Sequence, residues 1–254
     1  MKVFLFDGSI ELLYCAVFEY FETKEKESVS LQVESFFQPS FLDEITLIGF
    51  DAQKFERVKQ GIEKKVSANW QRKIIYAYLS ESVEVYQHIF EFLIYVFSNK
   101  NAVYNNYGNA NVIAIHNVAK SVSREKHRME AFIRFEKALD GTFFQKINPD
   151  YNVLPLISTH FKNRYADQKW IIFDEKRNYG CIYNLETVEV VYNPILEIES
   201  KTNVSTLLLN EQEMLYQQLW KDYFKATNIA SRKNTKLHLQ HVPRRYWKYL
   251  VEKQ

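Results

Sequence analysis

The chain has 254 residues, of which 46% are hydrophobic and 25% are charged, as is typical of a soluble globular protein that buries a sizeable core. Its net charge of +2 indicates no class of partner by itself. Because it contains only 6 glycines and 5 prolines, long elements are favoured over a sandwich of many short strands joined by tight turns.

The two cysteines, Cys15 and Cys181, are far apart and belong to no CxxC or Cys/His pattern, which argues against a zinc or iron–sulfur site. We therefore expect no bound metal. An apolar stretch and then Asp7-Gly8 follow Met1, so we expect no signal peptide. Charges interrupt every apolar run well short of a membrane span, and we expect a cytoplasmic protein with no membrane contact.

The first half of the chain mixes predicted strands with predicted helices. Asp51 precedes an amphipathic stretch and is expected to cap a helix there. In chain order, the residue patterns predict a strand at 2–6, a helix over 12–20, a charged loop at 23–30, a strand at 45–50, a helix from 51 to 66 and a helix at 81–98.

The stretch at 99–111 is rich in asparagine and is the best candidate for a linker. We expect one domain over 1–254, with at most a weak subdivision at this loop.

The second half again mixes the two kinds of element, with no regular alternation of strand and helix. The patterns predict a helix over 112–139, a strand at 142–147, a turn at 148–150, a helix at 153–165, a β-hairpin of 169–174 with 179–184, a strand at 187–192, a helix at 210–226 and a short helix from 243 to 252. This order favours an α+β fold that is predominantly helical and has a small mixed or antiparallel sheet.

The helix predicted at 112–139 carries a row of cations. Steps of three and four residues place Arg124, His127 and Arg134 on one face, and Arg128 adjoins it. Such a row suits phosphate groups, because arginine offers a rigid fork of donors. The alternative is a solvent-facing surface whose cations pair with nearby glutamates at 125, 130 and 136.

A second cluster combines the helix at 153–165 with the hairpin that follows it. His160 and Arg164 are one helical turn apart, Asp174 ends a strand, and Arg177 lies in the hairpin turn. If the hairpin packs on the helix, these four residues converge. A carboxylate that orients a histidine would make a general base, whereas an Arg–Asp pair would brace the fold. His127, His160 and Asp174 are the candidate catalytic residues.

The C-terminal stretch 221–254 carries nine basic residues against two acids and interleaves them with aromatic side chains. Arg232, Arg244 and Arg245 suit phosphates, and Trp247 suits stacking on a base. The alternative is that Trp247 packs the last helix onto the core. The predicted nucleic-acid contacts are therefore these four residues of the C-terminal stretch, Arg232, Arg244, Arg245 and Trp247, together with Arg128, Arg134, Arg164 and Arg177.

Common catalytic motifs are absent from the sequence. It contains no GxxxxGK[ST], GxGxxG, HExxH or GxSxG pattern and no cysteine triplet for a radical-SAM cluster. We therefore expect no cofactor.

Three blocks carry a resemblance to a known family: EKHRMEAFIRFEKALDG (125–141), PDYNVLPLISTHFKNRYADQKWIIFDEKR (149–177) and SRKNTKLHLQHVPRRYWKYLVE (231–252). With FDGSIELLYCAVFEYF near the start, they make the chain resemble a bacterial family described as radical-SAM-linked probable DNA metabolism proteins. The resemblance implies a radical-SAM partner and a role in DNA repair or modification. Similar domains also precede uracil-DNA-glycosylase-like domains, but the chain stops where the shared region stops, so we expect no glycosylase activity. The family supplies no catalytic residues.

The sequence thus leaves three hypotheses. The first is a DNA-associated protein that acts with a radical-SAM partner. The second is an adaptor that docks this partner without catalysis of its own. The third is an enzyme acting on a small molecule or nucleotide through His160 and Asp174.

Overall fold

The structure is a computed structural model. It describes residues 2–23, 28–101, 103–192, 215, 217–219, 221–222, 236, 239–240, 242–250 and 253. The chain divides into two compact units, unit 1 at Met1–Ser123 and unit 2 at Arg124–Gln254. This boundary lies inside helix α5 (Ala110–Phe132), downstream of the asparagine-rich loop that the sequence indicated. The expectation of a single domain stays a prediction.

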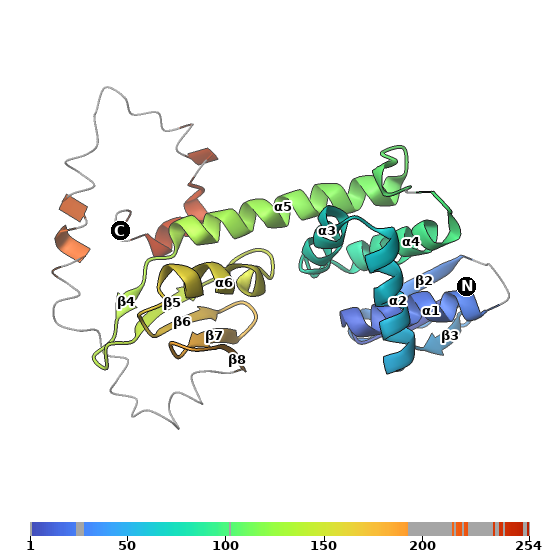
Figure 1. The fold of residues 1–254 in the computed structure, drawn as a ribbon, viewed down its shortest axis with the longest axis horizontal. Helices are drawn as coiled ribbons and strands as arrows, with labels where there is room; N and C mark the ends of the chain where they lie inside the picture. Colours follow the sequence, from blue (N-terminus) through green and yellow to red (C-terminus); the bar gives the residue numbers. More distant parts are fainter. Residues whose placement is uncertain are drawn as a thin grey trace. The chain divides into compact units, whose positions relative to one another are not determined.

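Unit 1 contains a three-stranded parallel sheet in the order β2-β1-β3. Its strands are β1 (Lys2–Phe6), β2 (Val29–Val33) and β3 (Glu44–Leu47) (Figure 1). The first and third strands were predicted. The second was missed, because its start adjoins a charged segment and only three of its five residues face the core.

Among the described residues, unit 1 contains four complete helices and the first part of α5. The predicted cap at Asp51 is confirmed, because Asp51 Oδ1 accepts from Gln53 N (2.8 Å). At the start of the first helix, Ser9 Oγ accepts from Leu12 N (3.3 Å). The third helix was not predicted. The helices are α1 (Ile10–Glu22), α2 (Ala52–Lys65), α3 (Ala68–Tyr78) and α4 (Val83–Ser98), and short 3₁₀ turns η1 (Glu34–Phe36) and η2 (Val103–Asn105) lie between elements.

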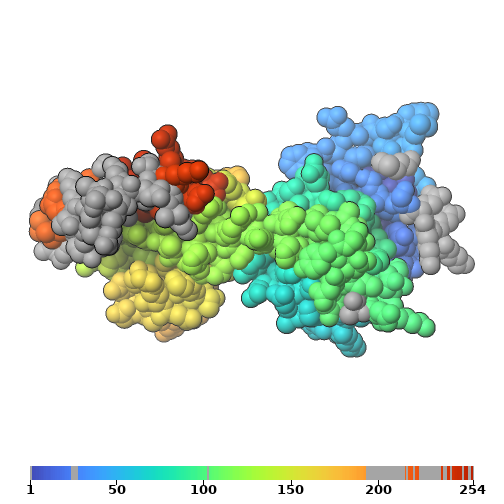
Figure 2. Space-filling model, turned by 90° about the horizontal axis from the view of Figure 1, so that it is seen from above, coloured from blue at the N-terminus to red at the C-terminus, as the bar shows by residue number. Residues whose placement is uncertain are grey.

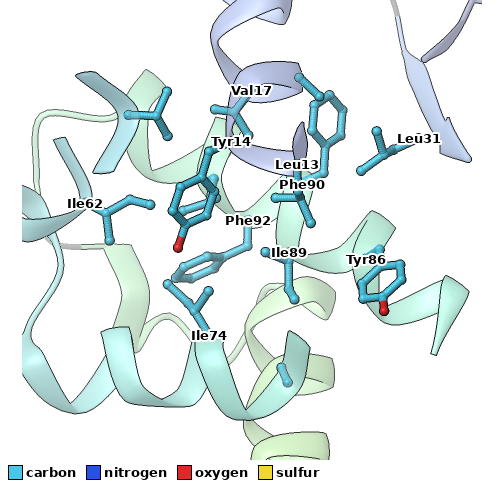
Figure 3. Close-up of a cluster of buried hydrophobic side chains, with 14 of the residues drawn as sticks. Leu13, Tyr14, Val17, Leu31, Ile62, Ile74, Tyr86, Ile89, Phe90 and Phe92 are labelled. Carbon is cyan, nitrogen blue, oxygen red and sulfur yellow. The ribbon is translucent and has the colours of Figure 1, made fainter. Parts of the chain in front are cut away.

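These helices enclose the core of unit 1. Figure 3 shows Leu13 and Tyr14 of α1 among Ile89 and Phe92 of α4, and all four are buried. Trp70 of α3 stacks on Phe92 with ring centroids 5.5 Å apart. The wide apolar stripe of α4 is therefore core packing, as its periodicity indicates.

Helix α5 ends at Phe132, and the prediction that it runs to Leu139 is wrong. Arg134 Nη1 donates to the carbonyls of Ala131 (2.7 Å) and Ile133 (3.2 Å), at the helix end. The next residues form a short strand, which turns back through Gly141 at φ +85°.

Unit 2 contains a five-stranded mixed sheet in the order β4-β5-β6-β7-β8, with α6 (Leu154–Arg164) between β5 and β6. β5 and β6 are parallel and the other pairs are antiparallel, so the predicted hairpin is confirmed. Gly180 is required there, because an added Cβ would lie 2.9 Å from the Ile172 carbonyl oxygen. The strands are β4 (Glu136–Lys137), β5 (Phe143–Ile147), β6 (Trp170–Asp174), β7 (Tyr179–Tyr183) and β8 (Val188–Tyr192).

At the C-terminus, the short helix predicted from Pro243 is a 3₁₀ helix, η5 (Arg244–Tyr249). Most of the helix predicted at 210–226 lies outside the described residues. Together, small parallel and mixed sheets with many helices confirm the α+β class. Among the described helices, none is both long enough and apolar enough to span a bilayer.

Candidate functional site

A buried carboxylate organises the part of unit 2 where α5 meets η5. The side chain of Glu125 is only 1% exposed. Its Oε2 accepts from Arg245 Nη2 (2.6 Å) and from the Tyr246 hydroxyl, and its Oε1 accepts from Asp150 N (3.2 Å). Arg128 Nη1 lies 3.9 Å from the same Oε2. Several donors therefore surround the buried Glu125 carboxylate and satisfy its oxygens.

Tyr246 holds η5 against α5. Its side chain is buried, and its ring packs against Phe132 with centroids 5.4 Å apart. Burial, with the hydrogen bond to Glu125, raises the pKa of the Tyr246 hydroxyl above its ordinary value. The hydroxyl is therefore protonated at neutral pH and donates to the carboxylate.

The turn that contains Asp150 joins this network to the hairpin. Arg245 Nη1 forms an ion pair with Asp150 Oδ2. Lys176 Nζ and Arg177 Nη2 donate to the Asp150 carbonyl at 2.9 and 3.2 Å. Three segments far apart in the sequence, α5, the β6–β7 hairpin and η5, are thus linked through one turn.

Asp174 and Arg177 form a second buried ion pair. Asp174 is fully buried, and Arg177 Nη1 donates to Asp174 Oδ2 at 2.9 Å and to the Pro149 carbonyl at 3.3 Å. Asp174 Oδ1 also accepts from the amides of Lys176 and Arg177. Burial raises the pKa of Asp174 above its ordinary value, although the Arg177 guanidinium acts in the opposite direction.

His160 lies near a different carboxylate. Its Nδ1 is 3.9 Å from Glu130 Oε1, which also accepts from Lys126 Nζ. Among the described residues, no hydrogen bond or ion pair joins His160 to Asp174. The predicted four-residue convergence is therefore seen only for Asp174 and Arg177, an arrangement that suits bracing the hairpin.

The remaining predicted site residues fall into three groups. His127 and Arg164 are exposed, on α5 and at the end of α6. The Arg134 guanidinium donates to carbonyls at the end of α5. Arg232 lies outside the described residues.

Cations and aromatic rings alternate along η5. The Arg128 and Arg245 guanidinium carbons lie 6.0 and 4.7 Å from the centroid of the Tyr246 ring. Arg244 and Lys253 lie 5.9 and 5.6 Å from the centroid of the Trp247 ring, and Trp247 Nε1 donates to the Val242 carbonyl at 3.0 Å. In Figure 2 the red C-terminal atoms lie against the yellow-green end of α5. We call the set His127, Arg128, Arg244, Arg245, Trp247 and Lys253 the α5–η5 surface.

The charge of the chain is divided unequally between the units. Residues 1–123 contain 12 lysines and arginines against 15 aspartates and glutamates, whereas residues 124–254 contain 21 against 16. Unit 2 therefore has a formal net charge of +5, whereas that of unit 1 is −3. Two of the acids in unit 2, Glu125 and Asp174, are buried against arginines.

Within the described part of the chain, no group of three or more histidine, cysteine, aspartate or glutamate side chains is arranged to hold a metal ion.

The role of Glu125 was not predicted: it entered only the alternative interpretation, as a partner for cations on a solvent-facing surface. Glu125 stands among Arg124, Lys126 and Arg128, and its main partners lie about 120 residues away. Only the aromatic–cation pattern of the C-terminal stretch gave a signal, and it indicated a ligand surface rather than a partner for a buried carboxylate.

Comparison with known protein families gives a match over much of the chain. The family DUF4130, a domain of unknown function, matches residues 83–252, about two thirds of the chain. No curated protein and no solved structure matches. The matched range covers α4, α5 and the described elements of unit 2, including Glu125 and η5. The chain therefore belongs to the DUF4130 family.

Proposed function

We propose that the chain binds nucleic acid through the α5–η5 surface and acts beside a radical-SAM partner in DNA repair or modification. The observation that carries this proposal is the half-exposed Trp247 ring, held between Arg244 and Lys253 with its indole nitrogen already bonded to the Val242 carbonyl. A fixed aromatic face between cations suits an unpaired base together with its flanking phosphates.

Each side chain of the surface has a distinct part in this proposal. Arg244 and Lys253 contact phosphates, and Trp247 stacks on a base. Arg128 and Arg245 retain exposed guanidinium surface, with side chains 27% and 43% exposed, while they pair with Glu125. Arg164 and His127 are exposed and remain candidates for further contacts to the nucleic acid. Arg177 is only 9% exposed and bonded inward, so we assign it to bracing.

Replacing Arg244 by glutamate is expected to weaken binding of a fluorescein-labelled single strand of about 20 nucleotides by roughly tenfold. The slope of log K against log salt should also become shallower, by about the amount that one phosphate contact contributes. Trp247→Ala is expected to cost about 1–3 kcal/mol of binding, the usual contribution of one stacked base. Fluorescence anisotropy at low salt measures both.

Arg72→Glu is the matched control, because Arg72 is an arginine of unit 1 whose guanidinium donates to the Asn69 side chain on the same helix. Thermal unfolding of each variant separates lost binding from lost folding. Equal losses in Arg72→Glu and Arg244→Glu would contradict the assignment of the surface.

The radical-SAM partner rests on the sequence resemblance. Co-expression of the chain with a radical-SAM protein from the same genome is expected to yield a complex that survives size-exclusion chromatography. The complex should bind DNA more tightly than the partner alone, since unit 2 adds contacts. An unchanged affinity would favour the adaptor hypothesis, and the absence of a complex would contradict both.

A further inference from the structure

The edge of the sheet in unit 1 exposes an unusual amount of apolar surface. β3 is the last strand of the order β2-β1-β3, and in the described part of the chain no strand pairs with its outer edge. Large apolar side chains are exposed on β3 and on both sides of it, and two are more than three quarters exposed, Phe41 and Leu42. Apolar side chains this dense at one edge indicate an interaction surface. The exposed set is Phe36, Phe41, Leu42, Ile45, Leu47 and Phe50.

On the outer side of β3, the described residues supply no strand to pair with its backbone N–H and C=O groups. Ile48 N donates to the Leu5 carbonyl at 2.8 Å, and Thr46 is the register partner of Phe4. Because peptide groups alternate in direction along a strand, the N–H and C=O of Ile45 and Leu47 point away from β1. A strand placed alongside would find four backbone groups within three residues.

The side chains of the same two residues continue a buried face of the sheet. Ile45 and Leu47 are in register with Val3 and Leu5, so the four side chains lie on one face. Val3 and Leu5 are buried, whereas Leu47 is 70% exposed. The apolar face therefore extends past the last strand, and one more strand would cover it.

The charged residues of the edge segment itself have a single sign, and the adjacent strand β1 places Lys2 in register with Glu44. The segment 34–51 contains no lysine or arginine, and its charged residues are Glu34, Asp43, Glu44 and Asp51. A second copy of the chain would bring like charges together across an edge-to-edge pair. A segment that carries lysine or arginine would instead be attracted.

We propose that β3 takes an extended segment of a partner protein, in which apolar residues alternate with lysine or arginine and which adds to the sheet as a fourth strand. Its backbone bonds to Ile45 and Leu47, its apolar residues cover the open face, and its cations meet Glu44 and Asp43. This surface belongs to unit 1, and its occupation does not depend on nucleic-acid binding by unit 2.

The test uses the full chain and a fluorescein-labelled peptide of about ten residues in which valine and lysine alternate. Anisotropy is expected to show saturable binding, at least tenfold tighter than that of a valine–glutamate peptide of equal length. Leu47→Lys should weaken it at least tenfold. Ile45→Pro should do so as well, since it removes an outward N–H that β1 does not use. Ile75→Lys is the matched control, because Ile75 is an exposed apolar residue of α3.

Several outcomes would overturn the proposal. Equal binding of the two peptides would remove the charge argument. Unchanged binding by both β3 variants, each shown to be folded by circular dichroism, would place the peptide elsewhere. A dimer of the wild-type chain in sedimentation velocity that Leu47→Lys dissociates would make a second copy the occupant.

Discussion

Replacing Glu125 by alanine is expected to lower the free energy of unfolding of unit 2 by about 3–5 kcal/mol, the usual cost of removing one partner of a buried ion pair. The loss has two sources. The Tyr246 hydroxyl is left buried without its acceptor, and the Asp150 amide loses the Glu125 oxygen. Arg245 remains paired with Asp150, so its own contribution to the loss is smaller.

Urea unfolding followed by circular dichroism measures this change. Glu125→Gln keeps an acceptor oxygen but no charge, and is expected to lose less than the alanine variant. Glu186→Ala, at an exposed glutamate of the same unit, should change the free energy by less than about 0.5 kcal/mol. A loss at Glu125→Ala no larger than at Glu186→Ala would mean that η5 is not held to α5 through this carboxylate.

Replacing Asp174 by alanine is expected to cost a similar amount, about 3–5 kcal/mol, because it leaves the largely buried Arg177 guanidinium without its counter-charge. Asp174→Asn, which can still accept from Arg177 and from the hairpin amides, should cost less. Calorimetric melting temperatures provide the comparison. A catalytic Asp174 would behave differently, since its replacement would leave stability nearly unchanged.

The pH dependence of the same pair follows from the raised pKa of Asp174. The folded state then holds a proton on Asp174 over a range of pH in which the unfolded chain has already released it. The stability contributed by this group therefore falls as pH rises from its ordinary carboxyl range through the raised folded pKa. As pH rises above about 4, wild type should therefore lose stability relative to Asp174→Asn, which cannot titrate at this position. A relative gain would mean that the Arg177 pair outweighs burial.

Local signals in the sequence predicted much of the fold. The cap at Asp51, the stripe of α4 and the turn between β6 and β7 depend on residues within a few positions of one another. By contrast, the end of α5 could not be predicted from periodicity, because Phe135 packs against Phe161 and Trp170, which come from later elements. The helical spacing up to Leu139 is real, but tertiary packing overrides it.

The candidate site was likewise predictable where it depends on local composition and unpredictable where it depends on tertiary contacts. The basic and aromatic composition of the C-terminal stretch located the α5–η5 surface. Which arginines turn inward could not be foreseen, because the answer depends on buried carboxylates. Arg177 and Arg245 both lie beside another basic residue and near tyrosines in the sequence. In the structure, Arg177 is largely buried against Asp174, whereas the more exposed Arg245 bridges Glu125 and Asp150.

The affinity of the full chain for a single-stranded oligonucleotide, measured across a salt series, tests the proposed function most directly. If Arg128, Arg244 and Lys253 neutralise three phosphates, log K should fall linearly with log salt, with a slope of about −2 between about 50 and about 200 mM. Arg244→Glu should make that slope shallower. Absence of binding at the lowest salt, or an affinity that does not change as salt rises, would contradict the proposal that unit 2 binds nucleic acid.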